Sequence, residues 1–189
     1  MEGLILNLFG QPNLRQQDQV VELKSRKGWA LLAYLVLMPN PVSRESLATL
    51  FWPEHDAVGG RRNLRRLLYT LNQSPIQPYL RTDGEAVSLD WDGEIDVHLF
   101  LNRLEEGDWG TAVTLYNGDL LDGVVIGDSS QFEDWLTDQR EQLRQQMLRA
   151  LTSLTDDYLA NNNWIDAEAT VRKQLSLDNW NELLSLIHI

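Results

Sequence analysis

Residues 56–72 run Asp56-Ala57-Val58-Gly59-Gly60-Arg61-Arg62-Asn63-Leu64-Arg65-Arg66-Leu67-Leu68-Tyr69-Thr70-Leu71-Asn72. At about 100° per residue, a helix over this stretch gathers its leucines on one face. The opposite arc then carries Arg61, Arg62, Arg65, Arg66 and Tyr69. The sequence therefore predicts an amphipathic helix with an apolar face that packs and a basic face that stays exposed.

The basic face is suited to DNA. An arginine fork spans O6 and N7 of guanine, and it also clamps a phosphate group. Asn63 and Thr70 flank the arc, and an asparagine there can contact adenine or a phosphate. A charge run is usually a solvated face with local ion pairs, but no acidic residue lies between Arg61 and Asn72. We therefore favour nucleic-acid binding for this helix.

The residues around this helix predict a small α+β unit. The sequence predicts an N-terminal hairpin of strands at residues 4–9 and 20–23, helices at residues 25–37, 44–52 and 56–72, and a β-ribbon at residues 79–89. Ser43 is the expected N-cap of the second helix, and Asp83-Gly84 is the expected ribbon turn. This order of elements is typical of a winged helix-turn-helix.

Other basic side chains are placed to support such a helix. Arg26 and Lys27 begin the first helix, Arg44 lies in the first turn of the second, and Arg81 lies in the ribbon. Each of them alone is an ordinary surface charge. Together they surround one motif, and we expect them to hold phosphates and position the reading helix.

The second half of the chain is predicted to be helical. We expect helices at residues 97–104, 109–116, 132–159 and 165–177, with a loop at 118–130 and a turn at Asn161-Asn162-Asn163. The last two helices resemble one tetratricopeptide-like hairpin. Trp29, Trp52, Trp135 and Trp164 lie among apolar residues at helical spacing, and we assign them to packing.

Charge separates the two halves. The net charge of −12 alone argues against a nucleic-acid partner. Residues 15–81, however, hold ten basic and five acidic side chains, whereas residues 82–189 hold six basic and 22 acidic ones. The first half can approach phosphate, and repulsion should keep the second half away from it.

Catalytic, metal and membrane functions find little support in the sequence. The chain has no cysteine, and its histidines, His55, His98 and His188, stand in separate segments. It has no phosphate-binding glycine loop, and the acidic stretch 90–96 lacks the ligand spacing of a calcium loop. No apolar run reaches the roughly 20 residues of a membrane span. We expect a cytoplasmic protein without cofactor or metal that is not an enzyme.

The sequence resembles a known family over about residues 4–182. The motifs Lys27–Leu35, Val42–Ala48, Phe51-Trp52-Pro53 and Arg62–Leu71 resemble the DNA-binding half of the SARP family, the bacterial antibiotic-regulatory-type transcriptional activators. Those at residues 115–123, 132–136, 140–143 and 174–178 resemble the bacterial transcriptional activator domain that follows it. Gly59-Gly60 departs from the pattern, and there we expect the helix start to fray or to become ordered only on DNA. At Leu183–Ile189, a second departure, we expect the domain to be truncated.

The resemblance implies an OmpR-like winged helix-turn-helix over residues 1–95 and a helical, tetratricopeptide-like activator domain over residues 96–189. It implies binding to direct repeats in double-stranded promoter DNA, self-association on that DNA, and recruitment of RNA polymerase. By motif position, the helix that carries Arg61 to Tyr69 is the recognition helix. Ser43 and Arg44 begin the positioning helix, and residues 81–85 form the wing.

One other class of function stays open on the residues alone. The chain is also consistent with an interaction adaptor, in which the helical half binds a protein partner and the acidic excess serves that contact. The acid-free basic helix argues against the adaptor, which has no need of such a face.

Overall fold

The computed structural model describes residues 4–17, 19–82 and 84–187, with side chains described as far as residue 177. It is a helix-rich α+β structure with two small three-stranded sheets. The first half contains β1 (Ile5–Asn7), β2 (Asn13–Gln16), β3 (Gln19–Val21), α1 (Arg26–Leu37), β4 (Val42–Ser43), α2 (Arg44–Phe51), α3 (Ala57–Asn72), β5 (Leu80–Arg81) and β6 (Ala86–Leu89). The second half contains α4 (Asp96–Glu106), α5 (Trp109–Leu115), α6 (Ser130–Ala160) and α7 (Trp164–Ile187).

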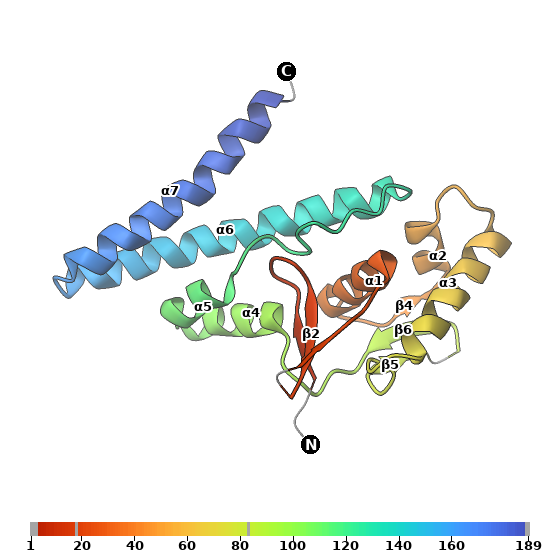
Figure 1. Cartoon of the computed structure of the whole chain (residues 1–189). Coiled ribbons are helices and arrows are strands. Elements are labelled where there is room, and N and C mark those ends of the chain that lie inside the picture. Colours follow the sequence, from red (N-terminus) through yellow and green to blue (C-terminus); the bar gives the residue numbers. More distant parts are fainter. Residues whose placement is uncertain (1–3, 18, 83, 188–189) are drawn as a thin grey trace.

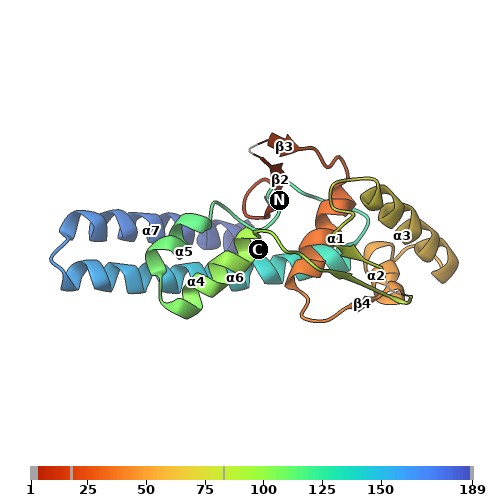
Figure 2. The same cartoon turned by 90° about the horizontal axis from the view of Figure 1, so that it is seen from below.

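The elements form an elongated molecule (Figure 1). The α6–α7 turn lies at one end, α2 and α3 lie at the other, and α4 and α5 lie alongside α6 (Figures 1 and 2). The predicted helices are confirmed to within a few residues, except that α7 runs ten residues beyond its expected end. The predicted turn is also confirmed, and Asn162 adopts a left-handed φ of 56° there, which asparagine tolerates well.

The strands differ from the prediction in two places. Two N-terminal strands were expected, but β1 and β3 do not pair with each other, because β2 lies between them and pairs antiparallel with both. The short strand β4 joins the ribbon to give the order β4-β6-β5. Neither β2 nor β4 has an alternating apolar pattern, since Leu14 is the one buried residue of β2 and β4 is two residues long.

Gly59 and Gly60 lie within a continuous α3, so the expected fraying of the helix start is wrong. The Asp56 carboxylate caps the helix by accepting a hydrogen bond of 2.7 Å from the Gly59 backbone N–H. Both glycines are buried, and a Cβ at Gly60 would lie 3.4 Å from the Ala48 Cβ. The missing side chain therefore lets α3 pack closely against α2.

The hydrophobic core is continuous between the two halves of the chain. The Phe132 ring of α6 lies 5.1 Å from the Phe51 ring of α2, and the Trp135 ring lies 4.8 Å from that of Tyr34. The Ser129 hydroxyl donates a hydrogen bond to the Leu50 carbonyl oxygen. The boundary at residue 95 thus divides the sequence by pattern, while the packing runs across it.

The tryptophans are not all core residues. Trp29 and Trp52 are buried and Trp135 is partly buried, as expected. Trp164, however, is 63% exposed at the first residue of α7, so its assignment to packing is wrong. Helical spacing places Trp164 on an apolar face of α7, but among the described residues no other helix covers this side chain.

The loop between α5 and α6 is fixed onto α6. Arg140 donates hydrogen bonds of 2.7 and 2.8 Å to the carbonyl oxygens of Leu120 and Leu121. Arg144 is buried and pairs with Asp119, which also accepts a hydrogen bond of 2.8 Å from the Tyr116 hydroxyl. Burial and the adjacent Asp119 carboxylate raise the pKa of Tyr116 well above its usual range, so this hydroxyl stays a donor.

The buried Asp96 carboxylate joins the N-terminal segment to α4. It accepts hydrogen bonds of 2.9 Å from the backbone N–H groups of Leu8 and Phe9, and one of 2.8 Å from that of Val97. Burial raises the pKa of Asp96, and the three N–H donors act in the opposite direction. The acidic stretch therefore supplies a structural carboxylate.

Replacing Asp96 with asparagine is expected to lower the free energy of unfolding by about 1.5–3 kcal/mol, because an amide group then faces buried N–H donors. Urea denaturation followed by tryptophan fluorescence measures the change. Asp92→Asn removes an exposed carboxylate from the same turn and serves as the control. Equal stability of the two variants would contradict this role of Asp96.

Candidate nucleic-acid interface

Helix α3 separates its leucines from its arginines as the sequence predicts. Leu64, Leu67, Leu68 and Leu71 are buried in the core. The four arginines are exposed, and Tyr69 is 67% exposed. The buried leucines fix the helix axis and rotation, so the basic face points outward at the end of the molecule distant from the α6–α7 turn (Figure 1).

The exposed face has a centre and two edges. At about 100° per residue, Arg62 lies almost opposite the leucines, with Tyr69 and Arg66 each about 30° from that point, on either side of it. Arg61 and Arg65 lie toward α2, where the Arg61 Nη2 is 3.4 Å from the Glu45 carboxylate. Arg66 lies toward the opposite edge. A central side chain can reach into a DNA groove, whereas the edge side chains lie where the groove walls would pass.

Three of the arginines remain available for a ligand. Within the described part of the chain, Arg62, Arg65 and Arg66 form no ion pair, and Arg61 has one contact with an exposed carboxylate. Exposed ion pairs of this kind contribute about 0–1 kcal/mol and exchange easily. The face therefore presents guanidinium groups that no internal anion neutralises.

The start of α2 is built around Ser43 and Arg44. Ser43 caps the helix by accepting a hydrogen bond of 3.0 Å from the Ser46 backbone N–H, which confirms its predicted N-cap role. The Arg44 backbone N–H donates to the Glu85 carbonyl oxygen at 2.8 Å and so joins α2 to the ribbon. The Arg44 side chain is half-buried, and its Nε has no hydrogen-bond partner among the described residues.

The two basic residues at the start of α1 differ in environment. Arg26 is exposed. The Lys27 side chain is only 18% exposed, and its Nζ lies 2.7 Å from both the Phe51 carbonyl oxygen and the Asp128 carboxylate. It also lies 4.5 Å from the centre of the Trp52 ring. Lys27 is therefore engaged within the protein, although its position in the sequence predicts a free surface charge.

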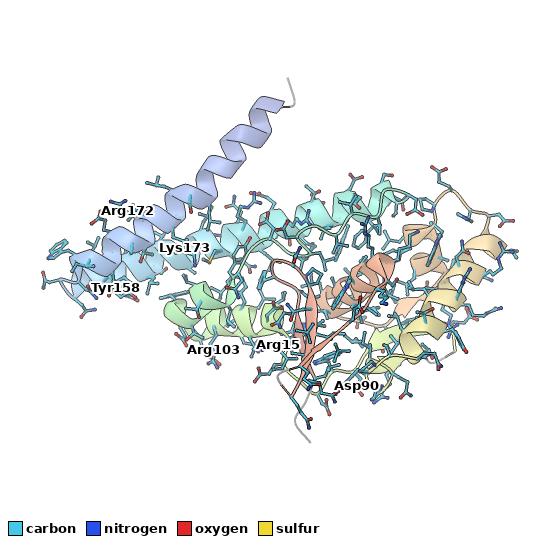
Figure 3. All side chains as sticks on the ribbon, viewed as in Figure 1. Arg15, Asp90, Arg103, Tyr158, Arg172 and Lys173 are labelled. Atoms are coloured by element: carbon cyan, nitrogen blue, oxygen red, sulfur yellow. The ribbon has the colours of Figure 1, made fainter. Side chains whose placement is uncertain are left out.

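The ribbon places Arg81 on its exposed side. The Arg81 guanidinium lies 3.0 Å from the carboxylate of Asp90, which Figure 3 labels near the lower edge of the molecule. Arg81 pairs with Ser88 in the register of β5 and β6. Of the expected wing residues, Asp83 lies outside the described residues.

An open groove of about 470 Å³ runs between α3 and the start of α1. Asn63, Arg66 and Thr70 of α3 line one side, and Lys27, Trp52 and Asp128 are among its other lining residues. Thus Arg66, Asn63 and Lys27, which are far apart in the sequence, share one surface depression. Arg26 and Arg81 do not line this groove.

Asp128 is a residue of this surface that the sequence does not reveal. It lies 101 positions from Lys27, in a loop with no pattern that marks it, and tertiary packing brings it to the groove. Trp52, expected in the core, is buried and also contributes to the groove wall.

Among the described residues, no group of three or more His, Asp or Glu side chains is arranged to hold a metal ion. Within the same residues, no helix combines the length and hydrophobicity that a bilayer-spanning segment requires.

Comparisons with known proteins place the second half of the chain in a family. Residues 101–187 match the bacterial transcriptional activator domain. A comparison with the curated proteins gives no match. Among solved structures, Mycobacterium tuberculosis EmbR in complex with a low-affinity phosphopeptide is similar, with a TM-score of 0.58 and 18% identity.

The likeness to EmbR covers 92% of this chain and 59% of the EmbR chain, so it extends over both halves of the present fold. The present chain therefore spans well under two thirds of that structure. The expected activator domain is confirmed over residues 101–187. Residues 101–187 therefore carry a bacterial transcriptional activator domain, and the chain as a whole is similar in fold to EmbR.

Proposed function

We propose that the chain binds double-stranded promoter DNA in a sequence-specific manner and activates transcription. In this proposal, residues 1–95 act as an OmpR-like winged helix-turn-helix, with α3 as the recognition helix and the β5–β6 ribbon as the wing. The observation that carries the proposal is the exposed face of α3, whose Arg62, Arg65 and Arg66 have no ion-pair partner among the described residues. Unpaired guanidinium groups on a helix anchored by buried leucines are suited to the major groove.

The geometry of α3 gives its side chains different expected contacts on DNA. Arg62, at the centre of the face, and Tyr69 beside it would contact base edges. Arg66 and Asn63, at the groove edge, would contact one strand backbone, and Arg61 and Arg65 would face the other. Arg61 would exchange its contact with Glu45 for a phosphate, since the exposed ion pair is weak.

The remaining basic positions would hold phosphates. Arg26 and Arg81 are exposed, and Arg81 would exchange Asp90 for a phosphate at the wing. Ser43 and Arg44 lie at the start of α2, where an anion also meets favourable backbone N–H groups. Such contacts would set the register of α3 on the duplex without specifying sequence.

The second half would serve protein contacts. Residues 96–189, as a tetratricopeptide-like activator domain, would contact RNA polymerase in the cytoplasm. Trp164 and Ile165 at the start of α7 are 63% and 82% exposed, which favours a protein-binding surface there. Binding to direct repeats would place two copies side by side on DNA. No catalytic role is part of this proposal.

Selection from a random duplex library on immobilised protein tests the proposal. We expect enrichment of a repeated motif, together with retention that falls steeply as salt is raised, because phosphate contacts release counterions. Retention is measured at two salt concentrations, by sequencing and by fluorescence anisotropy. A variant with Arg62, Arg65 and Arg66 all replaced by glutamine serves as the control and should retain no duplex.

The same experiment distinguishes the adaptor alternative. An adaptor would show no salt-dependent retention of DNA, and its wild-type and triple-glutamine forms would behave alike. That outcome would overturn the DNA-binding proposal.

A further inference from the structure

Asp128 carries a negative charge from the acidic half of the chain into the groove beside α3. Its carboxylate lies 2.7 Å from the Lys27 Nζ and is itself 58% exposed. Lys27, Arg66 and Asn63 line the same groove. The groove therefore holds two cationic side chains and one anionic side chain, and the anion comes from the loop that leads into α6.

The Lys27 ammonium is fixed in position independently of Asp128. It donates to the Phe51 carbonyl oxygen at 2.7 Å and lies over the Trp52 ring. The hydrogen bond to Phe51 uses one of the three N–H donors of Lys27, and the Trp52 ring contacts one side of the ammonium group. The donor now directed to Asp128 is the one that faces the open groove, where another anion can replace the carboxylate.

Asp128 is likewise held by its neighbours and does not depend on its own ion pair. The Ile126 backbone N–H donates to Glu133 at 2.7 Å, and the Ser129 hydroxyl donates to the Leu50 carbonyl oxygen. These anchors lie on both sides of Asp128 in the sequence. Removing the charge of Asp128 should therefore leave the loop in place.

We propose that this groove binds one phosphate of the DNA backbone and that Asp128 is a built-in competitor for it. On DNA binding, Lys27 exchanges the Asp128 carboxylate for the phosphate, while Arg66 approaches the same phosphate from α3. This inference rests on the proposed function and adds a regulatory element to it. The acidic half then limits DNA affinity through one defined side chain.

The exchange predicts how the DNA affinity of Asp128→Asn depends on salt concentration. In the wild type and in Asp128→Asn alike, Lys27 contacts the phosphate, so the same number of counterions leaves the DNA. Only the wild type must first break the ion pair between Lys27 and Asp128. The slope of log affinity against log salt should therefore stay the same, while the affinity of Asp128→Asn is higher at each salt concentration.

The test measures the affinity of Asp128→Asn for the selected duplex and for a random duplex across a salt series. We expect affinity for both duplexes to rise about two- to five-fold, which is the range for loss of one exposed ion pair. Asp122→Asn removes an exposed carboxylate of the same loop and should change neither affinity nor slope. Thermal unfolding verifies that each variant is folded, and Asp128→Ser provides a second uncharged variant.

Lys27→Gln completes a double-mutant cycle with Asp128→Asn. It should weaken binding little in the wild type but abolish the gain in affinity in the Asp128→Asn background. Unchanged or weaker binding by Asp128→Asn, or an equal gain from Asp122→Asn, would overturn the competitor role. Failure of the wild type to bind any duplex would instead overturn the proposed function.

Discussion

Arg62→Ala should weaken binding to the selected operator by about 1–3 kcal/mol and relax the base preference at one position. Arg62 lies at the centre of the exposed face of α3 and has no ion-pair partner within the described residues. Its loss removes a bidentate contact to a base edge, whereas affinity for random DNA should fall much less. Competition between operator and random duplexes measures this change in specificity.

Two variants control for charge and for position. Arg62→Lys keeps the charge but loses the planar fork, so it should retain affinity for random DNA and still lose base preference. Arg149→Ala removes an exposed arginine from α6, outside the proposed interface, and should have no effect. An equal loss on operator and random duplexes with Arg62→Ala would show that this residue contacts a phosphate instead.

Arg66→Ala is the contrasting variant on the same helix. Because Arg66 lines the groove at the edge of the face, the Arg66→Ala substitution should lower affinity for operator and random duplexes by a similar factor. The pair of variants thus separates base contact from phosphate contact along one helix.

Phe132→Ala should lower the free energy of unfolding by about 3–5 kcal/mol. The Phe132 side chain is fully buried, and its ring lies 5.1 Å from Phe51 and 5.3 Å from Trp135. Its removal opens a cavity where α6 packs against α2. Because the hydrophobic core is continuous at this point, we expect both halves of the chain to lose stability together.

Urea denaturation followed by tryptophan fluorescence and by far-ultraviolet circular dichroism measures the change. Leu159→Ala removes a partly exposed apolar side chain from the other end of the same helix and should lower the free energy of unfolding much less. Two separate transitions in the wild type, with Phe132→Ala shifting only one of them, would contradict a shared core. A single transition would mean that residues 1–95 and 96–189 do not fold independently.

The sequence predicts the helices well because their apolar periodicity is strong. The leucines of α3 and the N-cap residue Ser43 are local signals, and the structure places them as expected. The strands β2 and β4 carry no such signal, since their pairing depends on β1, β3 and β6. Trp164 shows the limit of the same reasoning, because periodicity identifies an apolar face but not the element that covers it.

The sequence by itself determined which helix carries the basic face, because the spacing of arginines and leucines fixes their separation on any α-helix. It also determined that charge is divided between the two halves. Only the tertiary structure decided that Lys27 is engaged by Asp128, that Phe132 joins the cores, and that Arg66 shares a groove with α1. These contacts join residues distant in the chain, and local periodicity and capping carry no information about which distant surfaces bury each other.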